Sequence, residues 1–136
     1  MEKIMMIDVA LLVSRVAVGA VMAAHGAQKL FGAWGGPGVE KFSGFIKSIG
    51  FAPPLVWAWI ASIAEFGGGL FLILGIFPRL SAAAVSATML VAVVFVHGKS
   101  GFFASGGGYE YPLLILLVSL SLIISGAGKL SLFNKF

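Results

Sequence analysis

The sequence predicts an all-α integral membrane protein, an antiparallel bundle of four transmembrane helices with a short amphipathic helix in the first inter-helix loop. Three observations predict this fold. The 136 residues are 60% hydrophobic and 10% charged, with a mean hydropathy of +1.07. A soluble domain of this length buries only about two thirds of the surface of its unfolded chain, too little to hide so much apolar surface. Finally, four segments are long and apolar enough to cross a bilayer, which takes about 20 residues.

We expect one domain, in which the four spans cover residues 7–31, 55–77, 80–97 and 109–125. Each should be a helix, because hydrocarbon does not tolerate unpaired backbone groups. Only Pro78 and Arg79 separate the second span from the third, so these two spans should be antiparallel neighbours. A glycine-rich stretch joins the third span to the fourth.

The first inter-helix loop contains a predicted helix over about residues 38–49. Its apolar residues recur at helical spacing and fall on one face, opposite the charged residues; they are Val39, Phe42, Phe45, Ile46 and Ile49. This pattern is typical of a helix that lies in the membrane interface. A plain interfacial helix and a lid over a site both fit it.

Charge and composition exclude several function classes. The absence of cysteine excludes disulfides and thiolate chemistry within the chain. The net charge of +4 is spread over loops and ends, so we expect the partner to be a lipid bilayer and not nucleic acid. Lys3 precedes an apolar run that is too long for a signal peptide, and we interpret it as an uncleaved span. The distribution of Lys and Arg weakly favours cytoplasmic termini in a bacterial or archaeal inner membrane.

Ionisable residues lie inside the predicted spans. A charge near the bilayer centre costs about 2.5 to 3.5 kcal/mol on insertion scales, so it normally has a partner or a function. Counted along each helix at about 1.5 Å per residue, Arg15 and Glu65 both fall near the midplane. We therefore predict an ion pair between them, which would lock the first two spans together and could also serve a proton path.

A second polar group gathers at the membrane side that carries the first and third loops. His25 and Lys29 are one helical turn apart in the first span, His97 ends the third, and Glu110 begins the fourth. We expect these side chains to converge on a pocket that deepens toward the midplane. Each also has a structural interpretation: Lys29 can extend to the interface, and His97 and Glu110 suit the dipoles of their helix ends.

Aromatic residues lie on the same side. Tyr109 and Tyr111 fit either an interfacial aromatic belt or a pocket for a flat aromatic ligand. Two histidines without a recognisable ligand pattern favour neither a metal site nor haem, and we predict no covalently bound cofactor.

The ordered motifs of the chain resemble those of the DoxX family of small four-helix membrane proteins. The resemblance covers nearly the whole chain and rests on the arginine of the first span and on HGAQKLFG (25–32), GGPG (35–38), EFGGGL (65–70), LGIFPRL (74–80), HGKSGFFASGGGYEYP (97–112) and SGAGKLSL (125–132). It implies a four-helix inner-membrane protein. Relatives named with this family are linked to quinone reduction, including a thiosulfate:quinone oxidoreductase membrane subunit, and to quinone or oxidative-stress resistance. Related chains commonly finish with an SLD-like ending, whereas this chain reads SLFNKF.

The leading hypothesis is the membrane subunit of a quinone-linked oxidoreductase, which uses a membrane quinone and receives its electrons from a redox partner protein. A homo-oligomer is a further expected assembly. The candidate catalytic residues are His25, Lys29, Glu65 and Glu110, and the candidate ligand-binding residues are Arg15, His97, Tyr109 and Tyr111. The alternatives are a non-catalytic scaffold or assembly factor, and a small solute or proton transporter.

Overall fold

The computed structural model describes residues 3–136. Its helices are α1 (Met6–Phe31), α2 (Gly38–Ser48), α3 (Pro54–Leu74), α4 (Pro78–Val91) and α5 (Glu110–Ser125). A π-helical segment, η2 (Ala92–His97), continues α4, and short 3-10 turns occupy parts of the loops. The described part of the chain contains no β-strand.

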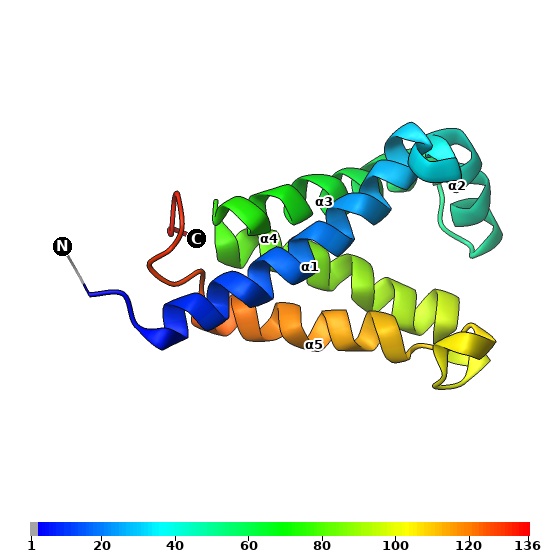
Figure 1. The fold of residues 1–136 in the computed structure, drawn as a ribbon. Helices are drawn as coiled ribbons and strands as arrows, with labels where there is room; N and C mark the ends of the chain where they lie inside the picture. Colours follow the sequence, from blue (N-terminus) through cyan, green and yellow to red (C-terminus); the bar gives the residue numbers. More distant parts are fainter. Residues whose placement is uncertain (1–2) are drawn as a thin grey trace.

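The four long helices α1, α3, α4 and α5 run side by side (Figure 1). Both termini lie at one end of the molecule, the terminal end, and α2 and the glycine-rich loop lie at the other, the loop end. Three helical stretches in the described residues are long and apolar enough to cross a membrane: Met6–Phe31, Pro54–Leu74 and Pro78–Ser100. Helix α5 is apolar but shorter, with 16 residues. The all-helical membrane fold is confirmed, and the fourth crossing stays a prediction.

The element boundaries follow local backbone chemistry. Helix α3 ends at Leu74, three residues before the predicted end, because Gly75 adopts the left-handed conformation (φ 68°) that terminates helices. Pro78 occupies the first position of α4, where its missing N–H costs nothing. The turn between α3 and α4 is therefore slightly longer than the two residues that the sequence predicts.

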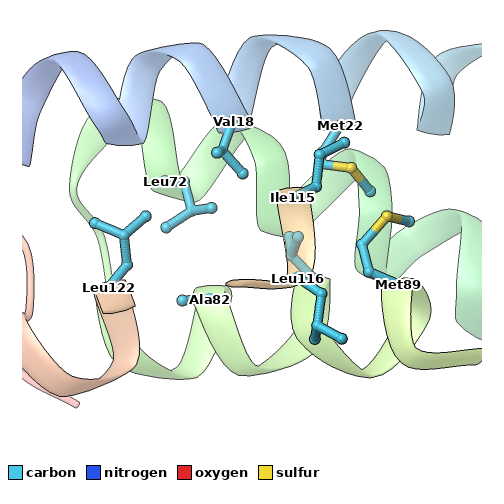
Figure 2. Packing of buried hydrophobic residues seen from close by; sticks show 9 residues of the cluster. Val18, Met22, Leu72, Ala82, Met89, Ile115, Leu116 and Leu122 are labelled. Atoms are coloured by element: carbon cyan, nitrogen blue, oxygen red, sulfur yellow. The ribbon is translucent and has the colours of Figure 1, made fainter. Parts of the chain in front are cut away.

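Apolar side chains from all four long helices fill the centre of the bundle (Figure 2). Val18 of α1 points toward Leu72 of α3, whereas Met22 of α1 points toward Met89 of α4 and Ile115 of α5. The buried members are Val18, Met22, Leu72, Ala82, Val85, Met89, Ile115, Leu116 and Leu122. This core lies between the two ends of the bundle and separates two sets of polar contacts.

Helices α1 and α3 touch backbone to backbone. A Cβ atom added at Gly69 would lie 2.5 Å from the backbone nitrogen of Ala23, and one added at Gly19 would lie 2.5 Å from the carbonyl oxygen of Gly69. No side chain larger than hydrogen fits these positions without moving a helix. Small residues drive such close helix packing in membranes, where lipid removes the hydrophobic force between helices. The contact fixes the register of α1 against α3.

In this register Arg15 lies beside the last turn of α3 and is fully buried. Its guanidinium donates to the carbonyl oxygens of Leu72 (3.1 Å) and Ile73 (3.4 Å), and to that of Leu130 in the C-terminal segment. The last carbonyls of a helix lack intrahelical partners and carry partial negative charge, which explains how a cation is stabilised there. Within residues 3–136 no hydrogen bond or ion pair joins Arg15 to a carboxylate.

The predicted ion pair between Arg15 and Glu65 is therefore wrong. The prediction assumed that α1 and α3 meet the loop end at the same depth. Glu65 lies about three turns into α3 but pairs with Lys29 in the last turn of α1, so α3 starts about two to three turns beyond the end of α1. Those additional turns pack on α2, where Ala58 is buried against Phe42 and Ile46.

The C-terminal segment closes the terminal end of the bundle. The Asp8 carboxylate accepts hydrogen bonds from the backbone N–H groups of Met5 (2.8 Å) and Lys129 (2.9 Å). Farther along, the N–H groups of Leu132 and Phe133 donate to the carbonyls of Leu74 (3.1 Å) and Gly75 (3.0 Å). Arg15 thus stabilises both the end of α3 and the segment that lies across it.

We predict that Gly69→Ala destabilises the protein and Gly67→Ala does not. The added methyl group at position 69 meets the α1 backbone, whereas a Cβ atom at Gly67 has no atom within 4 Å. Overpacking of this kind costs about 1 to 3 kcal/mol. The thermal unfolding midpoint of each variant in the same detergent measures the effect. Equal midpoints for the two variants would show that the α1–α3 contact is looser than described.

We also predict that Arg15→Met frees the C-terminal segment. The variant removes the charged donors to Leu72 and Leu130. Each hydrogen bond to a charged group contributes about 1.5 to 3 kcal/mol to stability. The loss of one such bond raises the equilibrium constant for local opening of the segment about tenfold or more. Hydrogen exchange at the Leu132 and Phe133 amides should accelerate accordingly. Ser14→Ala is the control, because the Ser14 hydroxyl bonds only within its own helix, to Ala10. Unchanged exchange in Arg15→Met would contradict the assigned role.

Candidate functional site

A cavity lies where α3 and α4 diverge. The two helices are close at Gly68, where an added Cβ atom would lie 3.3 Å from the Val85 side chain. They separate toward the loop end, where α2 lies beside the end of α3 (Figure 1), and residues of α2, α3 and α4 line the space. The cavity has a volume of about 650 Å³, within the range of about 300 to 1,000 Å³ that is usual for small-molecule sites. Its walls are mainly apolar.

Helix α2 forms the roof of this cavity. Its apolar face points inward: Phe42, Phe45 and Ile46 line the cavity, as does Ile49, the residue directly after the helix. Phe51 and Trp57 extend the aromatic wall beyond α2. Of the two interpretations of this helix that the sequence left open, its position agrees with a cover over a site.

A buried ion pair lies at the inner end of the cavity. Lys29 Nζ donates to Glu65 Oε1 at 2.6 Å, and the ammonium group also lies 4.8 Å from the centroid of the Phe42 ring. Glu65 is only 3% exposed, and its second oxygen, Oε2, has no hydrogen-bond partner in the described part of the chain. A buried acceptor without a donor costs about 1 to 3 kcal/mol or more, so the pair has unused capacity to bind a polar group.

His97 reaches the same cavity from the end of the π-helical segment η2. Its Nδ1 lies 2.7 Å from the carbonyl oxygen of Gly107. A carbonyl oxygen only accepts, so Nδ1 carries the hydrogen and Nε2 of the neutral ring is left as an acceptor. π-Helical turns inside α-helices occur frequently at functional sites. The glycine-rich loop therefore sets the tautomer in which a neutral His97 ring faces a ligand.

His25 is exposed along α1 and lines the cavity one helical turn from Lys29. Its ring lies 6.4 Å from that of Tyr111, centroid to centroid. A second, smaller cavity of about 130 Å³ adjoins the first, and both are lined by His25, Lys29, Glu65 and His97. Tyr111 lines this smaller cavity. Five predicted site residues thus come together.

The other three predicted site residues lie elsewhere. Glu110 Oε1 accepts a hydrogen bond from the backbone N–H of Ala104 (2.8 Å) and so holds the glycine-rich loop. The Tyr109 ring packs edge-on against Phe102, at 5.7 Å between centroids. Neither residue lines either of these two cavities, and Arg15 is at the terminal end. The expectation that Glu110 joins the pocket is wrong because its carboxylate serves the loop that precedes its helix.

Sequence reasoning missed the small and apolar wall residues. Ala61, Ala64, Ala84 and Ala87 line the cavity, together with Thr88. The α4 positions follow helical spacing, a signal that the sequence contains but that alone does not distinguish a cavity wall from a packed interface. Within residues 3–136 no group of three or more His, Cys, Asp or Glu side chains is placed to hold a metal ion.

The fold and the site define an all-helical membrane protein with a ligand-sized apolar cavity and a buried ion pair at its inner end. The chain belongs to the DoxX family, whose profile matches residues 10–98. No solved structure matches the chain.

Three curated relatives are similar to this chain. Two are uncharacterised proteins of Haemophilus influenzae, each 41% identical, over 80 residues (57% of this chain) and over 61 residues (45%). The matched parts span 60% and 40% of the length of these relatives. A Bacillus subtilis protein named "Putative oxidoreductase CatD" is 28% identical over 125 residues, which cover 92% of this chain and 85% of the relative.

We predict that Lys29→Met destabilises the protein more than the double substitution Lys29→Met with Glu65→Met. Removal of one partner from a buried pair leaves an uncompensated charge. Because Lys29 is 24% exposed, we expect a loss of stability of about 3 kcal/mol, the lower end of the usual range. Replacement of both partners by apolar groups is often nearly neutral. Unfolding midpoints in one detergent measure the order, with exposed Lys47→Met as the control. A double variant less stable than the single one would contradict the pairing.

Proposed function

We propose that this chain binds a membrane quinone in the cavity between α2, α3 and α4 and acts as the membrane subunit of a quinone-linked oxidoreductase. The observation that carries the proposal is the Lys29–Glu65 pair, held at the inner end of an aromatic and aliphatic cavity with an unpartnered Glu65 oxygen. The oxidoreductase name of the Bacillus subtilis relative adds support for redox chemistry, although that name belongs to the relative.

The residues present fit a quinone head group. Its ring is flat and apolar, and the rings of Phe42, Phe51 and Trp57 line the cavity that would receive it. Its two carbonyl oxygens only accept hydrogen bonds. The Lys29 ammonium group donates to Glu65 and has further N–H groups, and the His25 ring supplies another donor. Donors and ring surfaces thus match the two kinds of group that a quinone presents.

Reduction converts the quinone to a quinol by the addition of two electrons and two protons. The electrons would come from a reduced partner protein or a soluble donor that docks on this chain, and the two protons would come from that donor or from water at the loop end. Lys29 stabilises the negative charge that develops on a quinone oxygen as electrons arrive. In the quinol each oxygen carries a hydrogen, so the Glu65 carboxylate and His97 Nε2 gain donors to accept from. More of the hydrogen-bonding groups of the site therefore find partners on the quinol than on the quinone.

The same proposal places the protein in the cytoplasmic membrane with cytoplasmic termini and with α5 as a fourth span. Both termini lie at one end of the bundle, which requires an even number of crossings if each long helix crosses. Helix α5 covers about 24 Å of a hydrocarbon core of about 30 Å, so the flanking residues would have to complete the crossing.

The proposal predicts that the purified protein carries a quinone. The protein is isolated from native membranes in mild detergent, and its organic extract is analysed for quinone against protein concentration. We expect about one quinone per chain, and at least tenfold weaker retention in His25→Ala, whose side chain is exposed, with its ring centroid 6.4 Å from that of Tyr111.

Lys41→Ala is the control, since Lys41 is exposed on α2 and does not line the cavity. An extract without quinone, together with no change in unfolding midpoint when quinone is added, would exclude the proposal. Equal quinone retention in His25→Ala and Lys41→Ala would exclude the assigned donor.

A further inference from the structure

We propose that the cavity selects a quinone with a long aliphatic tail, which enters from the bilayer between α3 and α4 and rests along a groove whose width Ala84 and Ala87 determine. This inference rests on the proposed function, since it places the quinone head at the Lys29–Glu65 pair. It adds the class of quinone, its route and two specificity-determining residues.

The cavity is divided by polarity. Its ionisable groups, Lys29, Glu65, His25 and His97, come from its inner end, where it meets the smaller cavity. Away from them the α3 and α4 walls are almost entirely apolar, with Thr88 as the exception, and the Thr88 hydroxyl donates to the carbonyl of Val85 in its own helix (2.9 Å). A ligand that filled this space would therefore be polar at one end and aliphatic along the rest.

The apolar walls are two facing helical stripes. On α3 the stripe comprises Trp57, Ile60, Ala61 and Ala64, and on α4 it comprises Ala84, Ala87 and Val91. Residues three or four apart lie on one face of a helix, so each stripe is continuous along its helix. The two stripes face each other from Ala84, which lies beside Gly68, toward the loop end, where η2 brings His97 to the cavity.

This groove is open on its outer side. Trp57 is 42% and Ile60 51% exposed although both line the cavity, and Ala87 is exposed as well. Helices α3 and α4 belong to stretches that are long and apolar enough to cross the membrane, so the solvent on this outer side is lipid. A molecule dissolved in the bilayer can reach the ion pair through the groove without crossing an aqueous phase.

The tail is the part of the ligand that fits the groove. Lipid is as apolar as the groove, so a tail gains little free energy from the hydrophobic effect when it moves in. The groove acts through shape: it gives the tail a path while the head contacts Lys29 and Glu65. The short side chains of Ala84 and Ala87 keep this path open, and a large side chain on the same face of α4 would close it.

Ala87→Trp tests the inference against Ala83→Trp, which lies one turn earlier on the same exposed face and does not line the cavity. Full-length wild type and both variants are placed in vesicles of the same lipid. Binding is measured for two benzoquinones with one head group, one with a decyl tail and one without a tail. Partition of the tail into lipid is the same for all three proteins, so it cancels when each variant is compared with wild type.

We expect Ala87→Trp to weaken binding of the decyl quinone at least tenfold more than binding of the tailless quinone, each relative to wild type. Ala83→Trp should bind both within twofold. Binding of the tailless quinone also reports that the head site of Ala87→Trp is folded, and Ala87→Leu provides a smaller obstruction with an intermediate effect. If Ala87→Trp weakens both quinones equally or neither of them, the groove is not the path of the tail. If wild type binds neither quinone, the proposed function fails and the inference fails with it.

Discussion

The backbone contact between α1 and α3 at Gly19 and Gly69 is the constraint on which the other interactions depend. It fixes two helices at a single register, and that register decides which polar groups of α1 meet which groups of α3. At one end Arg15 reaches the carbonyls that end α3, and at the other Lys29 reaches Glu65. A shift of one helical turn would separate both sets of partners.

The cations Arg15 and Lys29 are stabilised in different ways, and Lys29 lies at a cavity. Arg15 donates to the carbonyl oxygens of Leu72 and Ile73 in the last turn of α3 and to that of Leu130 in the C-terminal segment, and it lines neither of the two cavities. Lys29 meets a carboxylate whose other oxygen is unpartnered, at the edge of a ligand-sized cavity. This difference supports the proposal that the chemistry occurs at the loop end and that the contacts at the terminal end serve stability.

The fold was largely predictable from the sequence, because hydropathy and the lack of water in a bilayer leave few options other than helices. The gathering of His25, Lys29 and His97 was predictable as well, since all three lie near the same end of their spans. The partner of Glu65 was not. Its identity depends on how far α3 extends beyond α1, and helical depth counted from each span's own end contains no information about that offset.

Two other features of the site, the partner of Glu110 and the direction of the His97 ring, are visible only in the structure. The carboxylate of Glu110 could have faced either the cavity or its own loop, and only the path of the glycine-rich segment decides that it accepts from Ala104. The π-helical turn that carries His97 has no proline or other sequence marker, so its effect on the direction of the ring is visible only in the structure.

The central claim is that Lys29 and Glu65 form the ion pair at the inner end of the cavity. Solid-state nuclear magnetic resonance on the protein in bilayers tests it directly, through the dipolar coupling between ¹⁵N at Lys29 Nζ and ¹³C at the Glu65 carboxyl group. A contact at 2.6 Å between nitrogen and oxygen predicts strong coupling. Coupling of the Glu65 carboxyl group to the Arg15 guanidinium instead, or to neither cation, would contradict the register and the site built on it.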